Sequence, residues 1–301
     1  MTEPSRPTVS VVIPHHGDPG PTLALVTSLL DAPGPAPQVI VADDASPIPF
    51  PDTDGVEVVR RERNGGFGAA VNSGAGVATG DLLLVLNSDL GVSPTFVADL
   101  VAAAAPWQPA VAGPLLLAPD GTPTNSARHF PTVAHQSIEW LTPLARHRDR
   151  PLLREAVGHD TRAIPGAVLP VDWLVGAALL LPRDLFARVE GFDEGYFMNS
   201  EEVDLQRRLR AHGIPSVFLG TVSVTHEGGG SSDPDLRRRW LVDSRFRYAA
   251  RWGGERRLRA ALTGATTLNL AANASRRLIG NNDVHPWQTA TQEWSLIWRK
   301  G

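Results

Sequence analysis

The chain has 301 residues, of which 42% are hydrophobic and 20% are charged. This composition excludes an extended disordered chain and predicts one main folded domain with a smaller appendage. The net charge of -4 argues against nucleic acid as a partner, and the lack of cysteine excludes disulfides, thiolate metal sites and cysteine nucleophiles.

The N-terminal segment, MTEPSRPTVSVVIP, lacks the charged and apolar regions of a signal peptide. No apolar run reaches the roughly 18 residues that a membrane-spanning helix requires. We therefore expect a cytoplasmic protein.

The first hundred residues alternate between strand-like and helix-like patterns. Short apolar runs predict strands at residues 9–13, 38–42, 56–60 and 82–86. Helical periodicity predicts helices at residues 21–30, 68–78 and 94–105. This alternation predicts an α/β fold with a doubly wound, mostly parallel sheet flanked by helices. Ligands of such sheets bind beyond the carboxyl ends of the strands, so the residues after each strand are the first candidates for a site.

The second half of the chain is less regular. Residues 119–165 are rich in Pro, His and Arg and have no clean period, which predicts a long loop or small lid facing a ligand. Strands are predicted again at 177–181 and 216–224, with a helix at 201–212 between them. Arg-rich and Ala/Leu-rich turns alternate from 234 to 277, as in one or two amphipathic helices.

Two acids, Asp43 and Asp44, follow the second predicted strand in the sequence VADDASP. A carboxylate at this edge can accept a hydrogen bond from a nucleobase N–H or a ribose hydroxyl. A turn that ends at Pro47 explains the same residues, and on this motif alone the turn is favoured.

Three glycines join the third predicted strand to the next helix, within RNGGFGAAVN at residues 63–72. Glycine lets backbone approach a ligand, and a helix start offers N–H groups to an anion. The Gly-Phe-Gly segment, with Asp89 further along, also resembles a dinucleotide-binding fingerprint. That match is poor because Val71 stands at the third glycine position and the loop follows the third strand, where the fingerprint follows the first.

The fourth predicted strand ends in Asn87, Ser88 and Asp89. The Asp89 carboxylate could hold a divalent cation against a diphosphate. Asp89 could also cap the next helix, but Ser93 and Pro94 already supply an N-cap and a first-position proline.

Three carboxylates, Glu201, Glu202 and Asp204, begin the predicted helix at 201–212, after an aromatic-rich segment. Acids in a first turn favour the helix dipole, and Asp204 can pair with Arg208. Crowded carboxylates beside apolar rings should also raise one pKa, as a general base near neutral pH requires. We prefer Glu202 as that base.

His226 follows the last predicted strand in the sequence THEGGGSS. A lone loop histidine is more often solvated than catalytic. Its place at a strand end, before a glycine run able to close over a phosphate, makes it a candidate metal or diphosphate ligand.

Taken in order, these motifs resemble glycosyltransferase family 2, whose members adopt the GT-A fold. The similarity covers about residues 8 to 250 and rests on VSVVIP, VADDAS, RNGGFGAAVN, LNSDL, WLVGAALLLPR, GFDEGYFMNSEEVDLQRRLRAHG and HEGGGS. It implies a GT-A catalytic domain at 1–232, with a nucleotide-binding half at 8–118 and an acceptor or catalytic half at 119–232. Residues 233–301 would form a C-terminal helical extension.

The resemblance also implies roles for individual residues. Asp43 or Asp44 would meet the base and ribose of the donor, and Glu202 corresponds to the family's catalytic base, usually an Asp. The implied donor-binding set is Pro14, Asp43, Asp44, Arg63, Asn64, Gly65, Gly66, Asn72, Asn87, Ser88 and Asp89. The implied acceptor and sugar pocket is Trp173, Gly176, Ala177, Glu201 and Asp204.

A metal site is implied as well. Asp89 corresponds to the last acid of the family's metal motif, which with His226 would hold Mg²⁺ or Mn²⁺. Asn87 replaces the first acid of that motif, and an amide oxygen is a poorer ligand than a carboxylate. Metal affinity should therefore be weaker than in relatives with two acids.

Within the family, the 191–205 segment together with SARHFPT at 126–132 is most similar to bacterial rhamnosyltransferases. This implies inverting transfer from a dTDP- or UDP-linked sugar, with dTDP-L-rhamnose as a candidate. The acceptor would be a hydroxyl, either lipid-linked or free, in glycoconjugate, cell-envelope or natural-product assembly.

Other interpretations stay open. A dinucleotide-dependent oxidoreductase would use the glycine loop and Asp89, and a non-catalytic nucleotide-sugar-binding protein would explain Asn87. The arginine-rich tail could rest peripherally on the inner face of an anionic membrane. Packing of these helices on the domain, or on a second subunit in a homodimer, explains the tail equally well. The arginines concerned are Arg256, Arg257, Arg259, Arg276 and Arg277.

Overall fold

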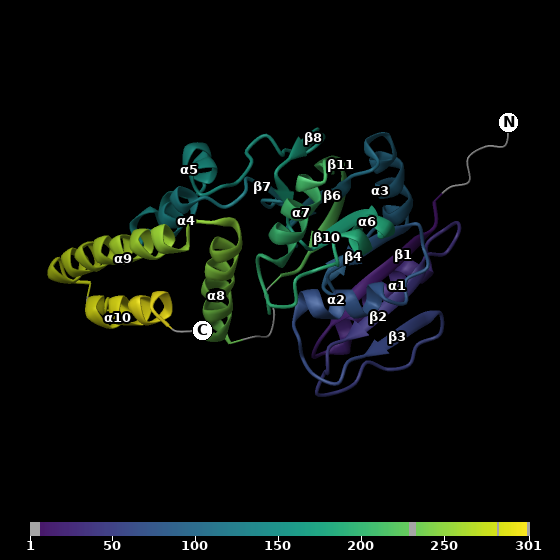
Figure 1. Cartoon of the computed structure of the whole chain (residues 1–301), viewed down its shortest axis with the longest axis horizontal. Coiled ribbons are helices and arrows are strands. Elements are labelled where there is room, and N and C mark those ends of the chain that lie inside the picture. Colours follow the sequence, from purple (N-terminus) through teal and green to yellow (C-terminus); the bar gives the residue numbers. More distant parts are fainter. Residues whose placement is uncertain (1–6, 229–232, 282, 300–301) are drawn as a thin grey trace. The chain divides into compact units, whose positions relative to one another are not determined.

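The computed structural model describes residues 7–228, 233–281 and 283–299. By its internal contacts the chain divides into two compact units, which are coloured along the sequence in Figure 1. The first, which we call the sheet unit, comprises residues 1–128 and 162–231. The second, the helical unit, comprises residues 129–161 and 232–301. Residues 129–161 thus group with the tail, whereas the sequence analysis placed them in the catalytic domain.

The four strands predicted in the first hundred residues are present and parallel. They are β1 (Val9–His15), β2 (Gln38–Asp43), β3 (Val56–Arg60) and β4 (Leu82–Leu86), in the order β3-β2-β1-β4. The accompanying helices are α1 (Pro19–Leu30), α2 (Phe67–Ala75) and α3 (Phe96–Ala104). The predicted start of α3 is wrong, because Ser93 and Pro94 lie before the helix and Thr95 is its N-cap.

The sheet continues with strands of both directions. It adds β10 (Ala178–Pro182), β6 (Val111–Leu117), β11 (Ser216–His226), β5 (Leu90–Gly91) and β8 (Val168–Val171). Strand β10 runs antiparallel to β4 and β6, whereas β11 runs parallel to β6. The sheet is therefore parallel in its N-terminal half and mixed beyond it.

Strand β6 was missed because it contains Gly113 and Pro114, which argue against a central strand. Proline has no N–H to donate to a neighbouring strand. The structure accommodates it by a shift of register between Leu219 and Ser223 on the partner strand β11.

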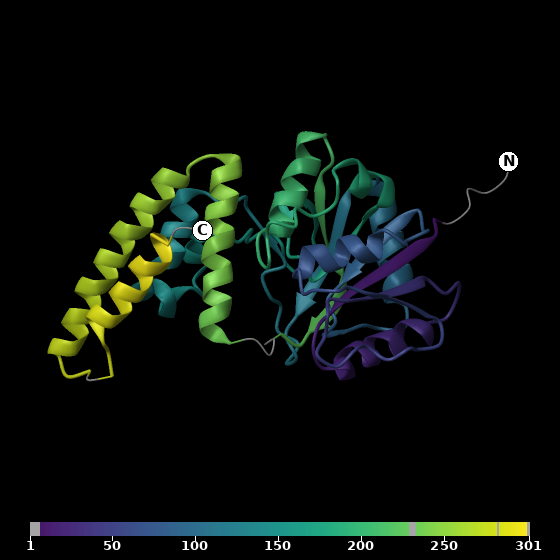
Figure 2. The ribbon, with the colours of Figure 1, turned by 60° about the horizontal axis from the view of Figure 1, so that its bottom comes forward.

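Both faces of the sheet are covered by helices, which confirms the doubly wound α/β arrangement (Figures 1 and 2). Along β4, Leu84 and Leu86 pack with α1 and α3, whereas Leu83 and Val85 pack with the opposite layer. That opposite layer includes α2, α6 (Arg183–Arg188) and α7 (Glu201–Ala211). Successive side chains of a strand point to opposite faces, so a continuous apolar run is buried on both.

The helical unit has a core of its own. Its elements are α4 (Val133–Trp140), η2 (Thr142–His147), α5 (Pro151–Ala156), α8 (Pro234–Trp252), α9 (Glu255–Leu278) and α10 (Pro286–Ile297). Residues 119–165, expected to form a long loop or small lid, contain α4, η2 and α5, and α10 follows the one or two helices expected at 234–277. The helices within 119–165 were missed because they are short and bury their apolar groups against distant parts of the chain. Trp140 of α4, for example, packs with Leu262 and Ile297.

A buried polar network joins the two sequence segments of the helical unit. The Glu293 carboxylate is 1% exposed and accepts hydrogen bonds from Trp140 Nε1 (3.2 Å) and Thr266 Oγ1 (2.9 Å). Arg238 Nη2 also donates to Glu293, at 2.9 Å. A buried carboxylate is stable only when it is paired in this way, so the network fixes α4 against α8, α9 and α10. Among the residues described, no helix is long and apolar enough to span a bilayer.

Candidate active site

The residues predicted to act together lie at strand ends of the sheet unit. Asp43 and Asp44 close β2, and Asn87 to Asp89 follow β4, which runs parallel to it through β1. His226 closes β11 and pairs with Leu90 of β5, which brings it beside Asp89. The topology therefore collects these groups along one edge, as expected for an α/β sheet.

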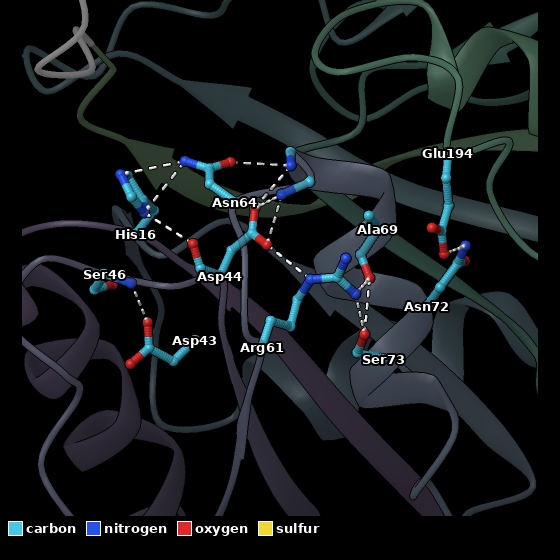
Figure 3. A network of polar contacts seen from close by, with 12 residues as sticks. His16, Asp43, Asp44, Ser46, Arg61, Asn64, Ala69, Asn72, Ser73 and Glu194 are labelled. Atoms are coloured by element: carbon cyan, nitrogen blue, oxygen red, sulfur yellow. Dashed lines mark hydrogen bonds and ion pairs between the residues drawn. The ribbon is translucent and has the colours of Figure 1, made fainter.

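The Asp44 carboxylate is enclosed by the protein itself (Figure 3). It is 3% exposed and accepts a hydrogen bond from Arg61 Nε at 2.8 Å. It also accepts the backbone N–H groups of Gly65 and Gly66, at 3.0 and 2.7 Å. We had expected Asp44 to meet the base or ribose, and the glycine N–H groups to meet a ligand anion. In the structure, Asp44 is the anion that these N–H groups bind.

Arg61 was missed by the sequence analysis, which singled out Arg63. Besides Asp44, the Arg61 guanidinium bonds Ala69 O at 2.8 Å and the Ser73 hydroxyl of α2 (Figure 3). Arg63 is exposed. The signal that could have identified Arg61 is the buried acid 17 residues earlier, which needs a cation as partner.

Asp43 holds the loop that follows β2. Its Oδ1 accepts the Ser46 N–H and its Oδ2 accepts the Phe50 N–H, each at 2.9 Å. Burial opposes ionisation of Asp43, but the hydrogen bonds from Ser46 and Phe50 outweigh it and lower its pKa. The backbone after Asp43 bends, with Ala45 in the left-handed region at φ +56°, so Asp43 has a structural role as the favoured interpretation of this motif expected.

Polar groups open to solvent lie beside this loop. His16 and Asn64 are exposed, and Asn64 Nδ2 lies 3.3 Å from His16 Nε2 (Figure 3). His16 Nδ1 lies 3.1 Å from Asp44 O. Pro14, in β1, is half-buried beside Ala42 of β2. His16 was missed, although it follows the first strand and so occupies a position where ligands bind.

The glycine loop is pressed against the segment that leads into α7. Gly66 has φ +85°, and a Cβ there would lie 1.8 Å from Phe197 O. The Phe67 N–H donates to the same oxygen at 3.2 Å. Asn72, expected in the donor pocket, instead bonds the N–H and the carbonyl of Phe192, both at 2.9 Å. Only glycine fits at position 66, and Asn72 is occupied in holding the 191–194 segment.

The carboxyl pair Glu201 and Glu202 begins α7. The two residues before it, Asn199 and Ser200, have φ of +73° and +68°, which is strained for residues other than glycine. Burial and the neighbouring Glu202 charge hold the pKa of Glu201 well above its usual range. Burial also raises the pKa of Glu202, against the opposing charge of Arg128. Within the described residues, the Oε2 atom of each is buried without a hydrogen-bond partner, so the pair retains a proton more readily than two solvated glutamates.

Gly176, expected with Ala177 in the pocket of the donor sugar, lies beside Glu202. A Cβ at Gly176 would lie 3.3 Å from Glu202 Cβ, so the absence of a side chain leaves room beside the carboxylate. Ala177 O accepts the Asn87 N–H at 2.8 Å. The segment before β10 therefore connects the carboxyl pair with the end of β4.

Trp173 is buried, with the Arg128 guanidinium 5.5 Å above its ring. The two residues face each other in the short sheet of β7 (Ala127–Arg128) and β9 (Trp173–Leu174). Gln206 of α7 holds β9 by bonding both the N–H and the carbonyl of Leu174, each at 2.8 Å. Arg128 and Gln206 were missed because their roles depend on pairing between distant segments.

Asp204 is 0% exposed, and Arg208 Nε donates to it at 2.8 Å. Arg208 Nη2 also bonds Gly191 O at 2.7 Å. The predicted pairing with Arg208 is confirmed. The expectation that Asp204 lines the sugar pocket is wrong, because its side chain is fully enclosed.

Asn87, Asp89 and His226 form a separate cluster at the ends of β4 and β11. His226 Nε2 lies 3.2 Å from Asp89 Oδ1 and 3.3 Å from Asn87 Nδ2, and the side chains of His226 and Asp89 are each about a quarter exposed. Burial alone would raise the pKa of Asp89, but the hydrogen bond and charge of His226 lower it. Ser88 lies in the turn between the other two residues of the strand end. The glycine run expected to close over a phosphate continues into residues 229–232, which lie outside the described residues.

These three side chains supply one carboxylate, one imidazole and one amide. In the described parts of the chain, no group of three or more His, Cys, Asp or Glu could hold a metal ion. The set fits a cation that completes its shell with other oxygens, such as those of a diphosphate, since Mg²⁺ and Mn²⁺ prefer oxygen ligands.

Comparison with known proteins decides the family. Residues 10–161 match the family model described as glycosyl transferase family 2. The chain belongs to glycosyltransferase family 2. This family 2 glycosyltransferase is 31% identical over 246 residues to the N-acetylglucosaminyl-diphospho-decaprenol L-rhamnosyltransferase of Mycobacterium tuberculosis, a match that covers 72% of this chain and 75% of the relative. It is 29% identical over 128 residues to the rhamnosyltransferase WbbL of Escherichia coli, covering 42% of this chain and 44% of the relative.

Solved structures confirm the fold of this glycosyltransferase. The mannosyltransferase PcManGT from Pyrobaculum calidifontis, in complex with GDP-Man and Mn²⁺, has a TM-score of 0.56 at 16% identity over 97% of this chain and 85% of its own. GalNAc-T7 with UDP, GalNAc and Mn²⁺ has a TM-score of 0.54 at 17% identity over 78% of this chain and 48% of its own. The predicted GT-A fold is thereby confirmed.

The alternative of a dinucleotide-dependent oxidoreductase rested mainly on the glycine loop of this glycosyltransferase, and the structure gives that loop another role. A dinucleotide-binding loop presents its glycine N–H groups to the pyrophosphate. Here the N–H groups of Gly65 and Gly66 are bound by Asp44. Family membership supports sugar transfer instead.

Proposed function

We propose that the chain is an inverting glycosyltransferase in which Glu202 is the general base. A continuous path of contacts carries the proposal. Glu202 adjoins Gly176, Ala177 O accepts the Asn87 N–H, and Asn87 contacts His226, which in turn contacts Asp89. A proton acceptor and a cation-binding group thus lie at the two ends of one short path, as a displacement at a sugar diphosphate requires.

The reaction is a single in-line displacement. The Glu202 carboxylate accepts the proton of the acceptor hydroxyl as its oxygen bonds to the anomeric carbon. The bond from that carbon to the diphosphate oxygen breaks on the opposite face, and the nucleoside diphosphate leaves with the electron pair. The raised pKa of Glu202 brings it nearer to the working pH of a base, and the Arg128 charge opposes its protonation.

The neighbouring Glu201 is more deeply buried and has the more strongly raised pKa. It is the member of the pair that stays protonated when Glu202 ionises. A neutral Glu201 leaves Glu202 without a second negative charge beside it, which would otherwise disfavour the ionised base.

Asp89, His226 and Asn87 would hold the divalent cation, with the Asn87 amide turned to present its oxygen. When bound, Mg²⁺ or Mn²⁺ offsets the charge that develops on the departing diphosphate. Two structural neighbours with the same fold are complexes with Mn²⁺, which supports this assignment.

For the donor we propose dTDP-L-rhamnose, and for the acceptor the hydroxyl of a lipid-linked sugar, used at the inner face of a membrane. The support is the 31% identity to a decaprenol-dependent L-rhamnosyltransferase over three quarters of that relative. Exposed groups at the strand ends, His16, Arg63 and Asn64, are available to the nucleotide.

A thermal-shift series with dTDP, UDP, GDP and their sugars, with and without Mn²⁺, tests the donor. Ligands that bind the folded state raise the melting temperature by mass action. The expected result is the largest rise with dTDP-L-rhamnose and Mn²⁺, followed by product formation with a short lipid-diphosphate acceptor. Stabilisation by dTDP-sugars without product from any acceptor would favour a non-catalytic binding protein.

A further inference from the structure

The turn between α9 and α10 exposes large apolar side chains. Leu278, Ile279 and Trp287 are 87%, 85% and 69% exposed, and we call this group the apolar tip. Figure 2 shows α9 and α10 side by side, joined by this turn at one end of the pair. The core of the helical unit, which includes Leu262 and Ile297, lies elsewhere along these helices. A cluster of exposed large apolar groups at one place marks an interaction surface.

Positive charge lies directly beside the apolar tip. Arg276 and Arg277 are exposed in the last turn of α9. Arg277 Nη1 donates to Val284 O at 2.8 Å, which fixes the turn that carries the tip. Among the described residues of this turn the acid is Asp283, so the tip has an excess of cationic groups. Arginine next to Trp and aliphatic side chains is typical of segments at a membrane interface.

Of the five arginines that the sequence analysis considered for membrane contact, only some lie near the apolar tip. Arg259 lies inside the helical unit, 4.3 Å from the Phe246 ring and bonded to Glu255 and to Ile297 O. Arg256 and Arg257 are exposed at the start of α9, roughly 30 Å from its other end at about 1.5 Å per residue. Only the Arg276 and Arg277 end carries the apolar tip.

We propose that the apolar tip inserts into the interface of an anionic bilayer while Arg276 and Arg277 contact lipid phosphates. The exposed apolar groups lie at one turn, so the proposed attachment is insertion of that turn from one side. The surface belongs to the helical unit and needs no substrate. It can therefore be tested separately from the proposed transferase activity.

The test is sedimentation of the full chain with vesicles of phosphatidylcholine alone and of phosphatidylcholine mixed with phosphatidylglycerol. We expect binding to the mixed vesicles. The double variant Leu278→Ser/Ile279→Ser should bind at least about tenfold more weakly, because two aliphatic side chains no longer leave water. Arg276→Gln, which leaves the bond from Arg277 to Val284 O in place, should bind mixed vesicles about fivefold more weakly and neutral vesicles almost unchanged.

Leu152→Ser is the matched control, since Leu152 in α5 is also 85% exposed in the helical unit. It should bind vesicles as the unchanged chain does. Each variant should keep its melting temperature and its transfer to a water-soluble acceptor, which separates loss of docking from loss of the proposed function. No binding by the unchanged chain, or equal binding by the tip variant, would overturn the proposal. If the unchanged chain is a dimer and the tip substitutions make it a monomer, the apolar tip binds a second copy of the chain instead of a membrane.

Discussion

The backbone of Gly176 passes so close to Glu202 that a methyl group at Gly176 would lie 3.3 Å from the Cβ of Glu202 and 3.4 Å from its Cγ. Such contacts are tight for close-packed atoms, so a side chain here would press on the stem of Glu202 and shift it by a few tenths of an ångström. The position of Glu202 is therefore set by a residue about 26 positions earlier, through the absence of a side chain rather than through a bond.

Gly176→Ala should lower the rate of sugar transfer about tenfold or more, since a small misplacement of a base is costly. The melting temperature should change by only a few degrees, because the added group is a single methyl. Gly264→Ala is the control, as a Cβ there meets nothing within 4 Å and the residue lies in helix α9. Equal transfer rates in the two variants would show that room beside Glu202 is unimportant.

Asp44→Ala should lower the free energy of unfolding by about 3 kcal/mol, because it leaves the Arg61 guanidinium and two glycine N–H groups without their anion. Asp52→Ala removes an exposed partner of Arg60 and should cost under about 1 kcal/mol. Urea unfolding measures both. A small effect at Asp44 would mean that its carboxylate is available to a ligand after all.

The raised pKa of Glu201 should appear as a pH dependence of stability. The folded state holds this proton more tightly than the unfolded state, for which the ordinary value is 4.5. Stability from this group is thus fully present below pH 4.5 and is lost as the pH rises from there through the folded pKa. Glu201→Gln should flatten this decline in urea unfolding measured from pH 4.5 to 8, whereas Glu194→Gln, at an exposed site, should not. An unchanged slope in Glu201→Gln would contradict the buried, protonated assignment.

Asn87→Asp should strengthen cation binding, because it adds a carboxylate beside Asp89 and His226. The concentration of Mn²⁺ that gives half-maximal stabilisation by the donor should fall about tenfold. Asp89→Asn should raise it. If neither substitution moves the Mn²⁺ dependence, the cation is held elsewhere.

The sequence was most informative where apolar runs are long and local. Buried strands such as β1, β2 and β4 read as continuous apolar runs, so their existence, and the polar residues at their ends, could be predicted from the sequence. Strand β6 could not, because Gly113 and Pro114 argue against a central strand until its partners are known. Terminal positions of helices also differed by a few residues, as at α2 and α3.

The roles of polar residues were harder to predict because they depend on partners far along the chain. Asp44 was predicted to contact the donor, yet in the structure its carboxylate bonds Arg61 and two backbone N–H groups. The grouping of residues 129–161 with the tail depends on contacts such as that of Trp140 with Glu293, 153 positions away. The sequence around either residue alone does not predict a contact between residues so far apart in the chain.

The most direct test of the account is Glu202→Gln, assayed for both transfer and donor binding. The amide keeps the size and position of the side chain beside Gly176 but accepts no proton from a hydroxyl. We expect transfer to fall by at least about a thousandfold, within the range for loss of a general base. The thermal shift caused by donor and Mn²⁺ should stay unchanged. Turnover near that of the unchanged chain would contradict the role of Glu202 and the displacement mechanism built on it.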